Sequence, residues 1–173
     1  MAAMTHLAVG LAAKRIAPKT PVILLILAAY AIDMIWGVFY YFGIETMADG
    51  TTTNPWSHGL FMSLVWSALV GLIVFWVSHK NRRAGWIAAL LVFSHWVIDF
   101  ISHPMLFAFP NDTGLSIFFD GSPTVGLGLW RTELGTNIGE YGVLAAGAVF
   151  YILTLIKFRR EKKPAKASSS SPS

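Results

Sequence analysis

Three ionisable side chains recur at four-residue intervals in an otherwise apolar segment: His95, Asp99 and His103. Residues four apart lie on the same face of an α-helix, so the spacing predicts one polar stripe along an apolar helix. Placing an ionisable group in membrane hydrocarbon costs about 2.5–3.5 kcal/mol on insertion scales. The stripe therefore predicts side chains directed at a metal ion, at a proton path or at one another.

The composition is typical of a membrane protein. Of the 173 residues, 55% are hydrophobic and only 13% are charged, whereas soluble domains carry about 25% charged residues. The net charge is +4, but the basic residues stand at the ends of apolar segments, which favours a membrane over nucleic acid as the partner. The chain has no Cys, which excludes disulfides, thiolate nucleophiles and Cys-ligated metals.

Four apolar segments are long enough to cross a bilayer, which takes about 20 residues. They lie near residues 21–44, 58–78, 85–107 and 137–156. An earlier apolar stretch, 2–13, is too short to cross and is predicted to be an interfacial or half-inserted helix. The predicted fold is therefore an all-α, polytopic membrane protein with four transmembrane helices plus this short N-terminal helix. A single transmembrane domain covers residues 1–160, and a disordered cytoplasmic tail covers 161–173.

The basic residues predict the orientation of these helices. They cluster before the first span, between the second and third, and after the fourth. The other two loops, 45–57 and 108–136, hold five acidic residues and a single base, Arg131. By the positive-inside rule, the basic segments and both termini are predicted to be cytoplasmic.

Ionisable groups from all four spans are predicted to lie at similar depth. At 1.5 Å per helical residue, their depths from the nearest cytoplasmic base are about 18 Å (His95), 21 Å (Asp33), 24 Å (Asp99), 26 Å (Glu140), 30 Å (His103) and 33 Å (His58). These depths predict a polar pocket in the outer half of the bilayer, capped by the loop 108–136. His6 belongs to it only if the first helix dips inward.

Some of these residues also have a purely structural interpretation. Asp33 can be a buried carboxylate that is hydrogen-bonded to a Tyr, and Glu140 can face a water-filled vestibule. His58 follows the turn sequence 54–57 and can be an interfacial residue at the start of its span.

The donor types are those of a hard or borderline metal site. Nitrogens of His and oxygens of carboxylates bind Zn²⁺ at about 2.0–2.2 Å, and Fe, Mn and Ni are alternatives. His95 and His103 are about 12 Å apart along a straight helix, so one ion cannot readily bind both. Either Asp99 bridges two ions about 3.5–4 Å apart, or one His supports another ligand. A metal-activated water is the expected nucleophile, with Asp33 or Glu140 as its general base.

Four short segments carry a family resemblance. They are Met4-Thr5-His6-Leu7, Asp33, Ser57-His58-Gly59-Leu60 and Ser94-His95-Trp96-Val97-Ile98-Asp99. In this order, the chain from residue 4 to about 103 resembles the bacterial inner-membrane metal-dependent hydrolase family. The resemblance implies a bacterial inner-membrane location, hydrolytic activity and metal ligands at His6, Asp33, His58, His95 and Asp99. The chain departs from the family pattern in having a single Asp33 in place of a paired Asp-x-Asp.

Three functions are consistent with these residues. The preferred one is metal-dependent hydrolysis of a lipid-like or periplasmic substrate, with a divalent metal, preferably Zn, as the cofactor. The alternatives are a non-catalytic haem or metal-binding subunit and a small proton- or ion-coupled carrier. The expected partners are membrane lipid and a lipid-like substrate but no nucleic acid; a homo-oligomer or a role as accessory subunit of a larger membrane complex is also open. The predicted metal ligands are His6, Asp33, His58, His95, Asp99 and His103.

Overall fold

The computed structural model describes residues 3–46 and 54–162, so most of the predicted tail lies outside the described residues. The helices are α1 (Ala3–Ala12), the 3₁₀ turn η1 (Ala13–Arg15), α2 (Val22–Ala29), α3 (Ala31–Tyr41), α4 (Leu60–Val77), α5 (Arg82–Ser102), α6 (Glu133–Asn137), the π-helical segment η2 (Ile138–Gly142) and α7 (Val143–Lys162). The strands described are β1 (Leu115–Ser116) and β2 (Thr124–Val125), which form one short antiparallel pair. The all-α prediction is confirmed.

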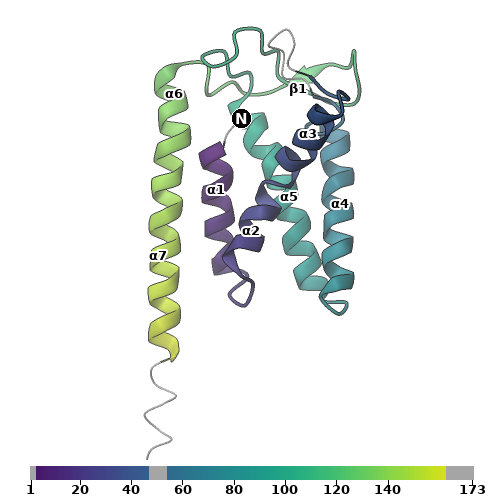
Figure 1. Cartoon of the computed structure of the whole chain (residues 1–173). Coiled ribbons are helices and arrows are strands. Elements are labelled where there is room, and N and C mark those ends of the chain that lie inside the picture. The colour runs from purple at the N-terminus through teal and green to yellow at the C-terminus, as the bar shows by residue number, and fades with distance from the viewer. Residues whose placement is uncertain (1–2, 47–53, 163–173) are drawn as a thin grey trace, which may run out of the picture.

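Three described helical segments are long and apolar enough to cross a membrane: α4, α5 and the continuous stretch Glu133–Glu161, which joins α6, η2 and α7. The first predicted span is instead a pair of helices, α2 and α3, bent by 55°. Figure 1 shows this pair running obliquely across the other helices. The described residues thus give three spans, or four if the bent pair counts as one, and their length and composition indicate a membrane protein.

The bend lies at Tyr30, between α2 and α3. The backbone of Tyr30 has φ −96° and ψ 3°, outside the helical region. Its hydroxyl donates a hydrogen bond to the carbonyl of Ala3, at the start of α1. The break in the first span is therefore tied directly to the N-terminal helix, and it sets the direction of the first turn of α3, which carries Asp33.

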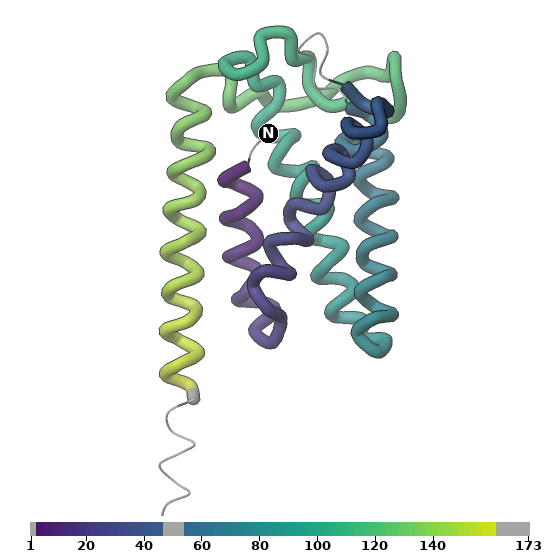
Figure 2. Tube along the Cα trace, in the orientation of Figure 1, coloured from purple at the N-terminus to yellow at the C-terminus, as the bar shows by residue number. Residues whose placement is uncertain are grey.

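The N-terminal helix α1 packs inside the assembly between α7 and α2 (Figure 2). A Cβ added at Gly147 of α7 would lie 2.7 Å from the Cβ of Ala8, so the two helices approach closely at a small residue. Near the start of α1, the Thr5 hydroxyl donates a hydrogen bond of 2.6 Å to the carbonyl of Gly139. The prediction of a short extra helix is confirmed.

The two ends of the described chain lie at different levels. α1 begins beside η2 and runs toward the basic segment Lys14–Arg15, whereas α7 ends at the far end of the molecule (Figure 1). The prediction that both termini are cytoplasmic stays a prediction.

Helices α4 and α5 form the most extensive contact in the molecule. Glycines allow it: a Cβ at Gly71 would lie 2.8 Å from the Cβ of Ala89, and one at Gly85 would lie 2.9 Å from the carbonyl oxygen of Gly71. Such small-residue contacts replace the hydrophobic driving force that is absent between helices in lipid. This pair provides the rigid support for the residues at the upper ends of α4 and α5.

Candidate metal centre

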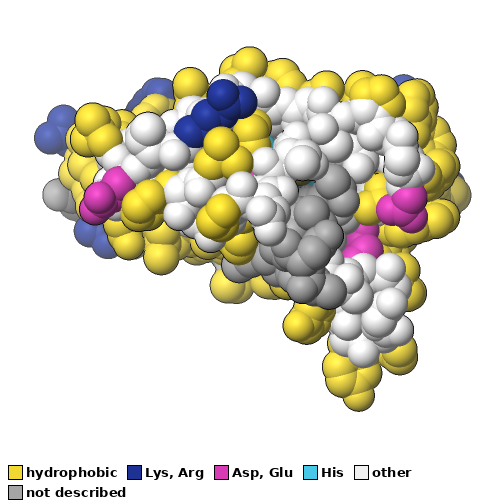
Figure 3. All heavy atoms as spheres, turned by 90° about the horizontal axis from the view of Figure 1, so that it is seen from above, with side chains coloured by type: hydrophobic (Ala, Val, Ile, Leu, Met, Phe, Trp, Pro, Cys, Tyr) yellow, Lys and Arg dark blue, Asp and Glu magenta, His cyan; other side chains and the backbone are white. Residues whose placement is uncertain are grey.

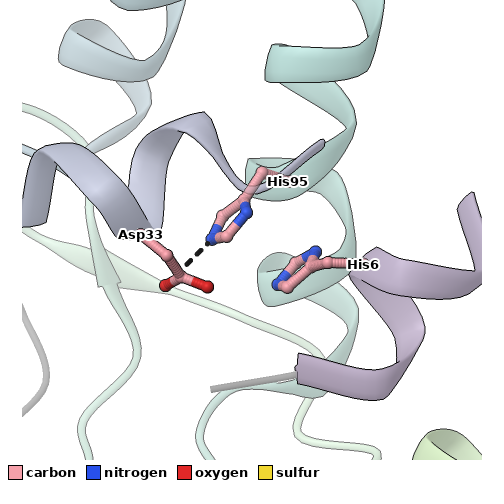
Figure 4. A group of neighbouring side chains, drawn as sticks. All are labelled: His6, Asp33 and His95. Carbon is pink, nitrogen blue, oxygen red and sulfur yellow. Dashed lines mark ion pairs between the residues drawn. The ribbon is translucent and has the colours of Figure 1, made fainter. Parts of the chain in front are cut away.

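Five side chains from four parts of the fold converge near the upper half of α5. His6 comes from α1, Asp33 from α3, His58 from the turn before α4, and His95 and Asp99 from α5. We call these five residues the His/Asp cluster. Figure 4 shows three of its members, His6, Asp33 and His95, pointing toward one another from three helices. His6 and His95 are 0% exposed, whereas the Asp33 side chain keeps 16% of its surface accessible.

The cluster contains two overlapping sets of three ligands. In the sets His6/Asp33/His95 and His58/His95/Asp99, the ligand atoms all lie within 4.8 Å of one another. Nε2 of His95 lies 3.5 Å from Oδ1 of Asp33 and 3.4 Å from Oδ2 of Asp99. Nε2 of His58 lies 3.3 and 3.6 Å from the same two oxygens. On the other side of Asp99, Oδ1 lies 3.3 Å from Nε2 of His6.

These separations match those between the ligands of a tetrahedral metal ion. Two ligands of such an ion, each bound at about 2.0–2.2 Å, are about 3.3–3.6 Å apart. All five distances given above fall in this interval. Buried His and Asp groups in this arrangement can hold a metal ion without large rearrangement.

The hydrogen bonding of His95 directs a lone pair into the cluster. Its Nδ1 lies 2.9 Å from the carbonyl oxygen of Ala29, the last residue of α2. A carbonyl only accepts, so Nδ1 carries the proton, and Nε2 of the neutral ring presents a lone pair. A backbone carbonyl that fixes the ring in this way is a common feature of metal-binding histidines.

Several buried polar atoms of the cluster have no hydrogen-bond partner among the described residues. They are both ring nitrogens of His6, Nε2 of His95 and Oδ1 of Asp99. The His6 and His95 rings also stack, with centroids 3.6 Å apart and planes at 7°. Two stacked imidazolium ions would repel each other, which disfavours a charge on both rings at once. The lone pair of a neutral ring would face carboxylate oxygens, and a cation bound between them would satisfy both.

His103 does not join the cluster. The helix α5 ends at Ser102, because His103 precedes Pro104 and the residue before a proline disfavours helical geometry. His103 is extended, with ψ 148°, and its Nδ1 lies 2.7 Å from Oδ2 of Asp112 in the following loop. The three-residue stripe of the sequence is therefore a two-residue stripe in the structure, and His103 is not placed as a metal ligand.

Glu140 is also held away from the cluster. Its Oε2 accepts a hydrogen bond of 2.8 Å from the backbone nitrogen of Met4, in the first turn of α1. A carboxylate at this position compensates the partial positive charge of a helix N-terminus. This contact positions α1, and with it His6, and the general-base role of Glu140 stays a prediction.

Two residues behind His58 were not among the sequence-predicted site residues. Oγ of Ser57 lies 2.7 Å from Nδ1 of His58 and donates to Oε2 of Glu45 at 2.6 Å. Oε1 of Glu45 accepts from the backbone nitrogens of Trp56 and Ser57 at 2.7 and 3.0 Å. The Ser57-His58 pair was visible in the sequence, but Glu45 was counted only as a loop charge.

A glycine next to His58 makes its position possible. A Cβ at Gly59 would lie 2.4 Å from the carbonyl oxygen of Pro55 and 2.9 Å from that of Phe118. The turn that carries His58 is therefore packed tightly beneath the long loop. Seen from this loop face, small areas of His and acidic surface are visible among polar and backbone atoms (Figure 3).

Comparisons with protein-family models, curated proteins and solved structures give no match to this chain. The site is therefore interpreted from its own geometry.

Proposed function

We propose that this chain is a metal-dependent hydrolase of a bacterial inner membrane, with a divalent metal ion, preferably Zn²⁺, in the His/Asp cluster. The observation that carries this proposal is the set of buried nitrogen and oxygen atoms at His6, His95 and Asp99 that have no hydrogen-bond partner among the described residues and lie within ion-pair distance of one another. Buried polar groups are normally hydrogen-bonded, and each unsatisfied one costs about 1–3 kcal/mol. A bound cation accounts for one nitrogen of His6, Nε2 of His95 and Oδ1 of Asp99 together, since one ion binds a single nitrogen of an imidazole ring.

Zinc is preferred because of the donor set and the spacing. Three imidazoles and two carboxylates match the ligands that zinc takes in catalytic sites, and the distances match its tetrahedral geometry. A bound divalent ion would polarise a carbonyl or phosphoryl group and lower the pKa of a bound water. The resemblance of the segments around His6, His58 and His95 to the inner-membrane metal-dependent hydrolases supports the same reaction class.

Asp33 is the best placed member of the cluster to meet a substrate. Its side chain is the most exposed of the five, at 16%, and we assign it as ligand or general base. An apolar groove of about 520 Å³ along α2, α3, α4 and α5 is lined by Ala31 and Met34, which flank Asp33 in the sequence, among others, but by no residue of the His/Asp cluster. The proposal of a lipid-like substrate rests on this apolar surface beside α3.

A metal-free serine hydrolase is a less suitable interpretation of the same residues. Ser57, His58 and Asp33 stand in the order nucleophile, base and acid. However, the Ser57 side chain is fully buried, and its hydroxyl proton is donated to Glu45. A nucleophilic serine needs that proton to go to the histidine.

Of the alternatives, the carrier has one specific observation in its favour. Glu45, Ser57 and His58 form a continuous hydrogen-bonded chain that leads from a loop to Asp33, and such chains also serve proton transport. For haem, the stacked His6 and His95 rings, with centroids 3.6 Å apart, are an unsuitable pair, because a porphyrin does not fit between them.

The proposal is tested with purified protein in detergent, using phospholipids in mixed micelles and soluble carboxylic and phosphoric esters as substrates. We expect turnover of at least one lipid-like ester that a chelator abolishes and added Zn²⁺ restores. His95→Ala should be inactive, whereas His79→Ala, at an exposed site far from the cluster, should be fully active. Stoichiometric metal without turnover of any ester would contradict hydrolysis and favour a binding subunit.

The orientation is proposed from the basic loops, which would place residues 79–84 and the C-terminal end in the cytoplasm. Single Cys residues at the exposed positions Lys80 and Asp120 are suitable reporters, because the chain has no Cys. A membrane-impermeant thiol reagent should label Asp120→Cys in intact spheroplasts and Lys80→Cys only after lysis. Labelling of both from the same side would overturn this topology.

A further inference from the structure

Glu45 lies outside the His/Asp cluster but is connected to it through two hydrogen bonds. Its Oε2 accepts from Oγ of Ser57 at 2.6 Å, and that Oγ lies 2.7 Å from Nδ1 of His58. Glu45 is only 4% exposed and Ser57 is fully buried. At the other side of the His58 ring, Nε2 faces the carboxylates of Asp33 and Asp99 at 3.3 and 3.6 Å.

The donors and acceptors of this chain allow a single direction. Oε1 of Glu45 accepts from two backbone N–H groups, and an ionised carboxylate has no proton to give. Ser57 therefore donates its one hydroxyl proton to Glu45. The remaining contact of Oγ is with His58, so Nδ1 of His58 carries a proton and donates it. At the other nitrogen, Nε2 lies 3.3 Å from Oδ1 of Asp33, which only accepts, so Nε2 donates to it when no metal is bound. Because Nδ1 keeps its proton for Ser57, Nε2 is the nitrogen whose proton a cation in the cluster would replace.

We propose that Glu45 is a positioning residue that, acting through Ser57, makes His58 a metal ligand through Nε2. This inference rests on the proposed metal site. The negative charge of Glu45 sets the direction of the hydrogen bonds, and Ser57 transmits that direction to the ring. Partners of this kind behind a ligating histidine fix its tautomer and increase its basicity.

An isosteric substitution of Glu45 should reverse the direction of these hydrogen bonds. In Glu45→Gln, the amide NH₂ group can donate to Oγ of Ser57, which turns the Ser57 hydroxyl toward Nδ1 of His58. Nδ1 then becomes the acceptor, and the one remaining ring proton stays on Nε2, where it blocks the metal. We expect Glu45→Gln to weaken Zn²⁺ binding by about 10–100-fold, the usual loss for such partners. The measurement is competition with a chromophoric chelator, which needs no substrate.

A purely structural role for Glu45 predicts a different result. Its Oε1 holds two backbone amides, and loosening these could disturb His58 without any effect through Ser57. A double-mutant cycle with Ser57→Ala separates the two explanations. If Glu45 acts through Ser57, Glu45→Gln should change zinc affinity by less than about threefold once Ser57 is replaced by Ala. We call the connection from Glu45 through Ser57 to His58 the relay. An equal loss of zinc affinity in both backgrounds would overturn it.

Asp120→Asn is the matched control, because it removes an exposed loop carboxylate and should leave zinc affinity unchanged. A second readout is independent of metal: ¹⁵N NMR of the ring nitrogens should find Nδ1 of His58 protonated in the native protein and unprotonated in Glu45→Gln. Native protein without zinc affinity but with this change at Nδ1 would refute the metal site and retain the relay. Tight zinc binding with no effect of Glu45→Gln would refute the relay alone.

Discussion

The molecule contains two buried groups of His and Asp that differ in how their polar atoms are satisfied. In the loop after α5, Oδ2 of Asp112 faces Nδ1 of His103 and accepts from the backbone nitrogen of Met105, and Oδ1 accepts from that of Gly114. In the His/Asp cluster, by contrast, atoms of His6, His95 and Asp99 are buried without a hydrogen-bond partner in the described part of the chain. The residue types are the same, and the burial is comparable.

The difference separates a structural pair, His103 with Asp112, from a ligand site, the His/Asp cluster. Asp112 organises the backbone of its own loop, because its carboxylate accepts from the backbone nitrogens of Met105 and Gly114 and faces Nδ1 of His103. The cluster draws its members from α1, α3, α5 and the turn before α4, and their free atoms converge. Shared chemistry is therefore a weak indicator of function, whereas unsatisfied atoms at metal-ligand spacing are a strong one.

The largest expected effect is on metal binding. His95→Ala and Asp99→Asn should each lower zinc affinity at least about 100-fold. Each removes a ligand that lies close to several other ligand atoms of the cluster. His103→Ala should retain the metal, because His103 pairs with Asp112 outside the cluster. Competition titration with a zinc indicator measures all three. Loss of zinc from His103→Ala would contradict the distinction between the His103/Asp112 pair and the His/Asp cluster.

The next effect is on thermal stability. If zinc at about 100 times its Kd stabilises the native state, the gain is about 2.7 kcal/mol, and a chelator should lower Tm by about 5–10 °C. Asp33→Asn/Asp99→Asn should be indifferent to the chelator. Acid should release the metal together with this stability, because the ligands bind metal only when deprotonated. Differential scanning fluorimetry gives the readout, and a native Tm that does not respond to chelator would argue for the carrier.

A smaller effect is expected at the structural pair. Asp112→Asn leaves an amide opposite donors that need an acceptor, and should cost about 1–3 kcal/mol of stability. Its response to chelator should equal that of the native protein, since the loop does not contribute to the cluster. Melting curves with and without chelator test both statements. An Asp112→Asn protein that had lost its chelator response would show that the two groups are coupled.

The smallest effect is expected at Glu140. Glu140→Gln keeps the contact with the backbone of Met4 but removes the charge near the start of α1, at a cost of about 0.3–1 kcal/mol. Hydrolysis should fall little, because the carboxylate positions a helix and does not touch the cluster. The rate on any ester that the native protein cleaves is the measurement. Abolished turnover with unchanged zinc affinity would restore Glu140 as the general base.

Much of the fold could be predicted from the sequence, because apolar length and charge placement are local signals. They predicted four apolar segments and a short first helix, and the described structure has helices at all of these places. The bend at Tyr30 was not predicted. It has no Pro or Gly to mark it, and it accompanies a hydrogen bond to Ala3, 27 residues away.

The candidate site was predicted in part for the same physical reason. The spacing of His95 and Asp99 is a property of one helix and is found in the structure. His103 has the same spacing, but Pro104 ends the helix first. Glu45 reaches the site through contacts with Trp56 and Ser57, more than ten residues away, and such contacts leave no periodic signal in a single sequence.

Elemental analysis of the native protein tests the central claim most directly. The protein should be purified without chelator and without an affinity tag that binds metal, and its metal content compared with that of His95→Ala. The account predicts about one or two equivalents of a divalent metal, zinc above others, in the native protein and a large loss in the variant. Folded native protein that carries no metal, and takes up none when zinc is supplied, would contradict it.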